Sequence, residues 1–325
     1  MTRRVLAVDG GGSKTDVVLV DTGGRVLAQA RGPSSQPQSI GVPAALAVLD
    51  ELVGRVRLES PPPAGEPLAD HAAVYLAGLD LPQEVAAIEP ALRARGWAGT
   101  LVLDNDTFAV LRAGTQALDA VAVTCGTGIN CVGRNAAGEH SRFAALGDLS
   151  GDWGGGGDLG RAARWHAARA DDGRGAPTLL QEAVAAHFGA PDAMSVGIAI
   201  HLGELSPRRL GDLAPVVLAT AARGDRIAGE LVDRLAAEIA LLATVSMRRL
   251  DLLERPVDLV LGGGVARSRD PRLFDRLTRH VLDANPRTGL VVVDVPPVVG
   301  AVLLGLDALG ATPEIGDRVR ADLVG

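Results

Sequence analysis

The sequence predicts an α/β protein built from two similar halves. Its 325 residues, 47% of them hydrophobic, are enough to form two domains with separate cores. Short β-rich runs alternate with longer helical patterns along the chain. A glycine hairpin near the N-terminus also returns once, because a shift of 114 residues places Gly126-Thr127 on Gly12-Ser13. An internal duplication therefore accounts for the organisation better than a chance likeness of two hairpins.

The first half opens with a β-meander. Apolar runs at 5–8, 17–20 and 25–28 surround two glycine-containing turns, which is the pattern of consecutive antiparallel strands. The run Gly10-Gly11-Gly12 therefore fits neither the dinucleotide fingerprint nor the Walker A loop, since both require a helix directly after the glycines. Glycines in a hairpin can still direct several N–H groups at one anion, although an ordinary glycine hairpin explains the run when it is taken alone.

Lys14 is the only lysine among the 32 basic residues of the chain, and it lies in this first turn. A compact cation here stands beside glycine amides and the hydroxyls of Ser13 and Thr15, a combination that suits a phosphate group. Depletion of lysine in a GC-rich genome is the alternative explanation. The surrounding loop must therefore carry the argument.

The rest of the first half alternates strands and helices. The expected elements are a helix at 43–57, a strand at 72–77, a helix at 82–95, a strand at 100–103 and a helix at 105–117. Three strands followed by strand–helix–strand–helix form a complete α/β unit that ends near Ala117.

The second half repeats the meander at 121–132 and then departs from the first. A largely helical insert is predicted over 159–250, and its last part, 225–250, is the longest helical pattern and a candidate partner interface. A buried strand at 257–261 then leads into the glycine turn 262–264. Glycines in that turn would let an adenine ring or an α-phosphate approach the backbone, although a strand–turn–helix needs no ligand.

Five short motifs follow one another along the chain. They are Asp9–Thr15, Asn105-Asp106, Gly126–Asn130, Gly151–Gly154 and Leu261–Val265. In this order they resemble the BadF/BadG/BcrA/BcrD-type ATPases, and within them the N-acetylglucosamine and glucosamine kinases of the actin and hexokinase superfamily. The resemblance covers about Arg4 to Leu309. It implies two actin-like (ribonuclease H-like) α/β domains with mixed five-stranded sheets, and ATP in the cleft between the domains.

Combined with the element order, the resemblance divides the chain near residue 117. We expect an N-terminal domain at 1–117, with a C-terminal helix at 300–325 as a candidate addition to it, and a C-terminal domain at 118–299 that contains the helical insert. The expected partners are ATP and a small amino sugar, with Mg²⁺ as cofactor, and the protein is expected to form a homodimer.

The resemblance also assigns roles to residues of both halves. The expected ATP- and phosphate-binding residues are Gly10, Gly11, Gly12, Ser13, Lys14, Thr15, Gly126, Thr127, Gly128, Gly262, Gly263 and Gly264. The expected sugar-binding residues are Gln36, Asn105, Asp106, Asp148, Gly151 and Asp152. Asp9 ends the first strand beside the glycines, where the resemblance implies that it orients Mg²⁺ through water.

Asp106 is the expected catalytic base. It follows the strand 100–103 and begins the next helix, so its carboxylate should lie at the strand's carboxyl end, where α/β sheets present their ligands. There it would accept the proton of a sugar hydroxyl during phosphoryl transfer, the role that the resemblance implies. A helix N-cap is the alternative role for Asp104 or Asn105, and Asp104 is the fallback base.

The expected sugar loop departs from the commoner family pattern. Trp153 stands where glutamate is usual, and Gln36 stands close to a position where relatives have asparagine. Asp148, Asp152 and Asp158 crowd one stretch, and carboxylates suit the free ammonium of glucosamine better than an acetamide. Solvated loop aspartates are the alternative. We therefore favour glucosamine over N-acetylglucosamine by a small margin, with phosphorylation at the 6-hydroxyl.

Composition restricts the other classes of function. The net charge of −7 argues against a nucleic-acid surface, and no window approaches the roughly 18 apolar residues of a membrane span. The N-terminus leads directly into a strand rather than a signal peptide, so we expect a cytoplasmic protein. Two alternatives stay open. Cys125 and Cys131 leave room for an iron–sulfur activator of a reductive dehydratase, and a non-catalytic sugar sensor would share the fold.

Overall fold

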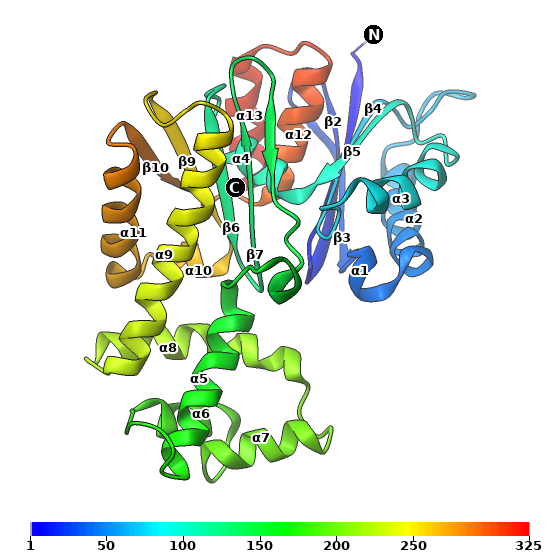
Figure 1. The fold of residues 1–325 in the computed structure, drawn as a ribbon. Helices are drawn as coiled ribbons and strands as arrows, with labels where there is room; N and C mark the ends of the chain where they lie inside the picture. Colours follow the sequence, from blue (N-terminus) through cyan, green and yellow to red (C-terminus); the bar gives the residue numbers. More distant parts are fainter. Residues whose placement is uncertain (1, 325) are drawn as a thin grey trace. The chain divides into compact units, whose positions relative to one another are not determined.

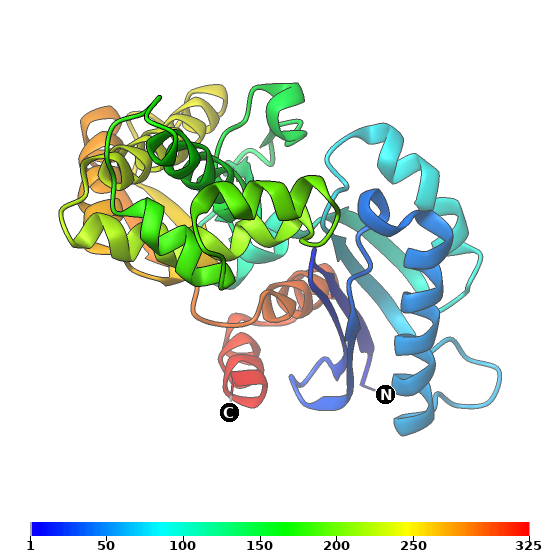
Figure 2. The same cartoon turned by 90° about the horizontal axis from the view of Figure 1, so that it is seen from below.

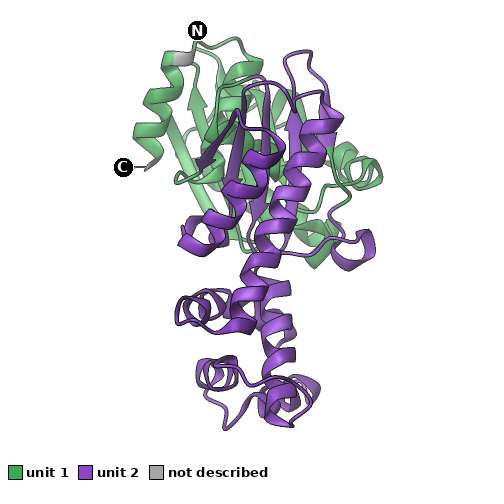
Figure 3. Ribbon diagram, turned by 60° about the vertical axis from the view of Figure 1, so that its left-hand side comes forward, with its two compact units in different colours: residues 1–117, 142–144, 293–325 green, residues 118–141, 145–292 purple. Residues whose placement is uncertain are grey.

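The protein separates into two compact units. The computed structural model describes residues 2–324. Unit 1 comprises residues 1–117, 142–144 and 293–325, and unit 2 comprises residues 118–141 and 145–292 (Figure 3). Each unit has its own five-stranded sheet. The last part of the chain therefore returns to the unit that contains the N-terminal half.

The sheet of unit 1 is mixed. Its strands are β1 (Arg4–Gly10), β2 (Lys14–Asp21), β3 (Val26–Pro33), β4 (Ala69–Leu76) and β5 (Ala98–Asn105), in the order β3-β2-β1-β4-β5. The first three strands are antiparallel, which confirms the predicted meander, and β1, β4 and β5 are parallel. Strand β1 has apolar side chains on both faces because helices cover both sides of this sheet.

Helices pack on both faces of that sheet. They are α1 (Pro37–Ile40), α2 (Val42–Glu59), α3 (Pro82–Arg93), α4 (Asp106–Gly114), α12 (Pro297–Ala308) and α13 (Pro313–Val324). Leu6 and Val8 of β1 belong to the apolar core that also contains the buried stripe of α2. Val5, on the opposite face of β1, contacts Gly305 of α12. Figure 2 shows α2 and α12 on the two sides of the sheet.

The C-terminal segment differs from the single helix expected over 300–325. It forms α12 and α13 instead, with a break at 309–312. Gly310 has a left-handed φ of 70°, which ends α12, and Pro313 begins α13. A left-handed glycine after a helix and a proline at the first position of the next are the usual signals of such a break.

The sheet of unit 2 has the same strand order as that of unit 1. Its strands are β6 (Ala120–Cys125), β7 (Ile129–Arg134), β8 (His140–Arg142), β9 (Val257–Gly262) and β10 (Thr288–Val292). The order β10-β9-β6-β7-β8 equals that of unit 1 when β6 is placed on β1. In both sheets the first strand is antiparallel to the second and parallel to the strand on its other side. The repeat read from the sequence is thus repeated in the topology.

Unit 2 also contains the helical insert between β8 and β9. Its helices are η1 (Gly147–Ser150), α5 (Gly155–Asp171), α6 (Leu180–Phe188), α7 (Ala193–His201), η2 (Pro207–Leu213), α8 (Ala214–Ala222) and α9 (Arg226–Arg249), and α10 (Gly264–Arg267) and α11 (Pro271–Ala284) follow β9. Figure 1 shows α5 to α8 beyond one end of the sheet. Within residues 2–324 no single helix has the length and apolarity to cross a membrane, although α6 and α7, bent by 48°, meet those criteria as a pair.

Candidate functional site

Two carboxylates lie at the carboxyl edge of the unit 1 sheet. Asp9 is near the end of β1, and Asp106 is the first residue of α4, directly after β5. The ladders pair Asp9 with Tyr75 and Tyr75 with Asp104, so these parallel strands end at the same edge. Asp9 is buried and Asp106 is half-buried. The predicted base therefore begins a helix at the edge where α/β sheets present their ligands.

The environment of these carboxylates shifts both of their proton affinities. Burial raises the pKa of Asp9 well above its usual range, and the nearby charges of Asp106 and Asp16 raise it further against the opposing effect of Lys14. Burial raises the pKa of Asp106 to about 6, although backbone N–H groups partly offset the shift. A buried and a half-buried carboxylate that repel each other favour a proton or a bound cation.

Asn105 is held in one orientation at this edge. Its Oδ1 accepts the N–H of Thr107 (2.9 Å), so Asn105 is the N-cap of α4. Its Nδ2 donates to Oδ1 of Asp80 (2.8 Å). Sequence reasoning missed Asp80, although its place shortly after β4 repeats the pattern that marked Asp106. Because Asn105 supplies the cap, Asp106 is left for another role.

Asp104, the fallback base, is engaged elsewhere. Its carboxylate forms an ion pair with Arg142 (2.5 Å) and accepts the N–H of Asn105 (2.6 Å). The Arg142 guanidinium also lies 4.7 Å from the centre of the Phe108 ring. Asp106 has no ion-pair partner among the described residues. The arrangement favours Asp106 over Asp104 as the group that is free to take a proton.

The predicted phosphate-binding residues of the hairpin between β1 and β2 include both exposed and buried positions. Gly12 and Ser13 are exposed at its tip. Gly10 is buried, and a Cβ there would overlap the side chains of Leu76 and Ser35. Thr15 is fully buried and donates its hydroxyl to Ser35 (2.8 Å). The tip can present N–H groups to a phosphate, whereas the expected contribution of the Thr15 hydroxyl conflicts with its place inside the unit.

Lys14 forms an ion pair rather than standing free beside the glycines. Its Nζ donates to Asp16 (2.6 Å), and its side chain is 42% exposed. Asp16 also accepts from Arg31 (2.5 Å). The cation that singled out this loop in the sequence is therefore shared with a neighbouring carboxylate, which lowers the charge it offers to a phosphate.

Gln36 lies on a loop that is fastened to the same hairpin. The Ser34 hydroxyl donates to the carbonyl of Gly11 (2.9 Å), and the Ser39 hydroxyl donates to Oε1 of Gln36 (2.8 Å). These bonds bring Gln36 beside the tip, because its Oε1 is 3.4 Å from the position of a Cβ on Gly12. The predicted sugar contact therefore lies next to the predicted phosphate hairpin.

In unit 2, glycines from three segments meet. The N–H groups of Gly156 and Gly157 donate to the carbonyls of Gly126 and Thr127 (both 2.8 Å). Gly263 has a φ of +91°, and a Cβ there would overlap the Cys125 carbonyl. The structure thus brings the predicted clusters 126–128 and 262–264 together. The glycine run 154–157 at the start of α5 joins them. The sequence showed that this run is rich in glycine, but it did not show that the run contacts the 126–128 hairpin.

Gly264 differs from its expected place in a turn, because it begins the four-residue helix α10. Gly262 ends β9, and Gly263 alone has the left-handed backbone that lets the chain change direction. Close approach of backbones around Gly126 therefore depends on a glycine at 263.

The expected sugar loop is less crowded with free carboxylates than the sequence indicated. Asp148 lies exposed on η1, and Gly151 ends η1 with a φ of 80°. The Ser150 hydroxyl donates to Asp152 (2.5 Å). Asp158 lies on α5, accepts the N–H of Gly154 (2.9 Å) and pairs with Arg161. Of the three carboxylates that suggested an ammonium ligand, Asp158 is thus committed to the protein.

Asp9 is the one residue predicted to act on a metal. No group of three or more His, Cys, Asp or Glu side chains among residues 2–324 is arranged to hold a metal ion. Mg²⁺ bound with nucleotides needs only one or two carboxylates, since water and phosphate oxygens supply the other ligands. A buried carboxylate with Asp106 and Asp16 as negative neighbours fits that requirement.

The fold is one shared with sugar kinases. A solved structure of a candidate N-acetylglucosamine kinase from Chromobacterium violaceum matches with a TM-score of 0.72 and 26% identity, over 94% of this chain and 99% of that one. A glucokinase of the ROK family from Streptomyces griseus shares the fold with a TM-score of 0.56 at 18% identity, over 94% and 98% of the two chains.

The chain belongs to the BadF/BadG/BcrA/BcrD ATPase family, whose model matches residues 6–305. An N-acetylmuramic acid/N-acetylglucosamine kinase from Clostridium acetobutylicum is 26% identical to it, over 92% of this chain and 97% of the relative. An N-acetyl-D-glucosamine kinase from Dictyostelium discoideum is 28% identical, over 93% and 98%.

Proposed function

We propose that the protein is an ATP-dependent amino-sugar kinase that phosphorylates the 6-hydroxyl of a hexosamine. The observation that carries the proposal is Asp106, a half-buried carboxylate with a raised pKa at the start of α4. It forms no ion pair among the described residues, and its negative charge acts on the nearby Asp9. The names of the relatives support the choice of an amino sugar as acceptor.

In this proposal Asp106 accepts the proton of the attacking sugar hydroxyl. A pKa near 6 leaves most of the carboxylate ionised at neutral pH and makes it a stronger base than an ordinary aspartate. Asn105, oriented by Asp80 and Thr107, contacts a second sugar hydroxyl. Asp9 would hold Mg²⁺ through water, and the ion would neutralise phosphate charge. In unit 1 the N–H groups of Gly12 and Ser13 are the proposed donors to phosphate, and in unit 2 those of Thr127 and Gly128, because the N–H groups of Gly11 and Gly126 already bond to the carbonyls of Lys14 and Gly128.

The acceptor is the finer question. We place N-acetylglucosamine first because both curated relatives act on N-acetylated amino sugars by name, and because Asp158 is withdrawn from the group that suggested an ammonium. Glucosamine is the second candidate. Asp152 supports it, because within residues 2–324 this half-buried carboxylate accepts the Ser150 hydroxyl and pairs with no cation.

A panel of glucose, glucosamine and N-acetylglucosamine, assayed with ATP and Mg²⁺, decides between the two. We expect the highest kcat/KM with N-acetylglucosamine, and we expect Asp152→Asn to slow all three sugars alike because Asp152 then contacts a shared hydroxyl. A preference for glucosamine of roughly tenfold or more, erased by Asp152→Asn but not by the exposed control Asp148→Asn, would establish the ammonium contact instead. Failure to phosphorylate any amino sugar would contradict the proposal itself.

The pH dependence should report Asp106. Its pKa is raised to about 6, so the carboxylate is ionised above that pH and protonated below it. The protonated form cannot accept the hydroxyl proton, so kcat/KM should fall about tenfold per pH unit below about pH 6 and level off above it. The measurement is a pH–rate profile at constant ionic strength. A profile flat down to about pH 5 would contradict the assignment.

The two other classes of function gain no support from the site. Cys125 and Cys131 are both buried in unit 2, whereas a cluster that bridges two subunits needs thiols presented at a surface. A non-catalytic sugar sensor would not require a base of raised pKa beside Asp9. The homodimer stays a prediction that a solution measurement of mass would test.

A further inference from the structure

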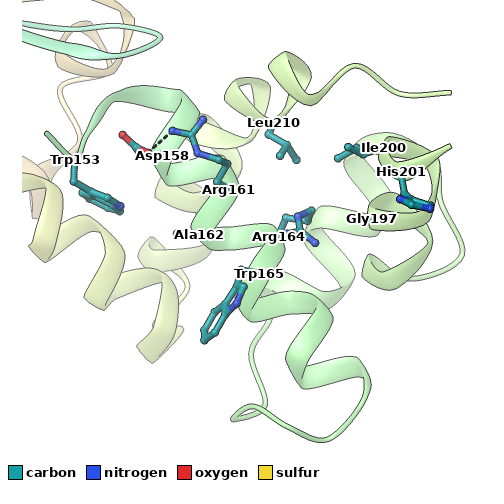
Figure 4. Close-up of a pocket in the computed structure, with 10 residues that line it drawn as sticks. All are labelled: Trp153, Asp158, Arg161, Ala162, Arg164, Trp165, Gly197, Ile200, His201 and Leu210. Atoms are coloured by element: carbon teal, nitrogen blue, oxygen red, sulfur yellow. Dashed lines mark hydrogen bonds and ion pairs between the residues drawn. The ribbon is translucent and has the colours of Figure 1, made fainter. Parts of the chain in front are cut away.

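The helical insert of unit 2 contains a cavity that the proposed reaction does not use. It measures about 550 Å³ and lies among α5, α7 and η2 (Figure 4). Its principal lining side chains are Trp153, Asp158, Arg161, Arg164, His201 and Leu210. Trp153 and Asp158 belong to the expected sugar loop, but the proposed reaction gives none of these six residues a contact with ATP, metal or sugar. The cavity thus presents aromatic, apolar and basic groups together.

The charge of this cavity is opposite to that of the chain. Arg161, Arg164 and His201 line it against a single carboxylate, Asp158, although the protein as a whole carries a net charge of −7. Asp158 pairs with Arg161, so that pair is balanced. The uncompensated positive charge is therefore that of Arg164.

Arg164 is the most informative lining residue. It is half-buried and has no acidic partner within the described part of the chain. Its Nη1 is 3.3 Å from the position of a Cβ on Gly197, so the guanidinium lies against α7 where a larger side chain would crowd it. A half-buried guanidinium without an acidic partner can donate charge-assisted hydrogen bonds to an anion that enters the cavity.

The other walls are apolar. Leu210 is buried, and Ile200 and the Trp153 indole complete the lining on either side of the arginines. The guanidinium of Arg234 lies 4.0 Å from the centre of the Trp153 ring, which holds the indole in place. Ligand cavities commonly combine an apolar wall with a few charged groups that fix orientation, and an aromatic wall suits a ring-shaped ligand.

We propose that this cavity binds an anionic carbohydrate, with a phosphate or carboxylate group at Arg164 and the sugar ring against Trp153. Arg161 would contribute a second contact, for which the ligand competes with Asp158. The consequence reaches the candidate phosphate site, because Asp158 accepts the N–H of Gly154. The glycines that follow Gly154 donate to the 126–128 hairpin. Helix α5 thus connects the cavity to that hairpin.

Tryptophan fluorescence tests the proposal without requiring kinase activity. Glucose 6-phosphate and glucuronate serve as the phosphate and carboxylate probes, with glucose as the neutral control, all without ATP. We expect saturable changes with an anionic sugar and none with glucose. Arg164→Met should weaken binding roughly tenfold or more. Arg223→Met is the matched control, an exposed arginine of the same insert outside the cavity, and it should bind like the wild type.

A second variant changes affinity in the opposite direction. Asp158→Asn keeps an acceptor for the Gly154 N–H but frees Arg161, so binding should tighten, a result that poor folding cannot imitate. Trp153→Phe should remove the part of the fluorescence change that comes from the Trp153 indole. Trp165 also lines the cavity and accounts for the rest, while Trp97, buried in unit 1, stays constant. Absence of saturable binding, or equal affinity in wild type, Arg164→Met and Asp158→Asn, would overturn the proposal. Whichever of the two probes binds more tightly identifies the anionic group.

Discussion

Asp106→Ala is expected to lower kcat by roughly 10²–10⁴ while the KM for ATP barely changes. The physical reason is that the carboxylate takes the proton of the acceptor hydroxyl and does not contact the nucleotide in the proposed reaction. Steady-state kinetics with the preferred amino sugar, varying each substrate in turn, measures both constants. The more conservative Asp106→Asn should show a similar loss, because an amide cannot accept that proton.

The unfolding temperature of each variant distinguishes a loss of catalysis from a folding defect. The pKa of Asp106 in the folded protein lies above its unfolded value, so the ionised side chain destabilises the fold at pH values above about 6. Asp106→Asn should therefore unfold at the same temperature as the wild type or a higher one at neutral pH. Asp104→Ala is the opposite case, because it breaks the ion pair with Arg142. It should lower the unfolding temperature clearly and change kcat only slightly. Near-normal turnover in Asp106→Ala would transfer the role to Asp104.

Gly300→Ala should produce the second large effect, from a position outside the site. Gly300 lies where α12 crosses α4, and a Cβ there would overlap the carbonyl oxygen of Ala109. The Arg112–Asp307 ion pair (2.7 Å) fastens the same two helices. Because backbone rather than a flexible side chain is in the way, α4 must shift. We expect a loss of about 1–3 kcal/mol in stability, and about 10² in kcat if Asp106 moves by about 1 Å.

Gly54→Ala is the matched control for that experiment. Gly54 also lies inside a helix of unit 1, α2, but a Cβ there meets open space. Alanine is the better helix former, so this variant should gain about 0.5–1 kcal/mol and keep normal kinetics. Denaturant unfolding and kcat, measured for both variants, decide the matter. Equal behaviour of Gly300→Ala and Gly54→Ala would contradict the proposed coupling between α12 and Asp106.

The meander, the repeated hairpin and the place of Asp106 followed from local patterns. Alternating apolar runs around glycine turns specify antiparallel strands without reference to the rest of the chain, and the strand–helix junction at Asn105-Asp106 needs only adjacent residues. The segment 300–325, expected as a single helix, forms two, because Gly310 ends α12 with a left-handed φ and Pro313 begins α13.

Such local patterns could not predict contacts between residues that are distant in the sequence. Asp158 and Arg161 are neighbours on a helix, but the contact of Gly156 with Gly126, that of Gly300 with Ala109 and the bond from Asn105 to Asp80 join separate elements. The commitment of Thr15 to Ser35 likewise depends on which face of β2 is buried. A one-dimensional pattern records how often apolar groups recur and not which neighbours they meet.

The sequence by itself determined the α/β class and the duplicated half, and it supplied the candidate residues for phosphoryl transfer, because each depends on residue type and spacing within one element. Only the tertiary structure decided which of those residues are free to act. In the structure Asn105 is the N-cap of α4 and Asp104 forms an ion pair with Arg142, whereas Asp106 forms no ion pair among the described residues. The physical reason is that a charged group's role depends on its burial and its partners, and folding brings those partners from elsewhere in the chain.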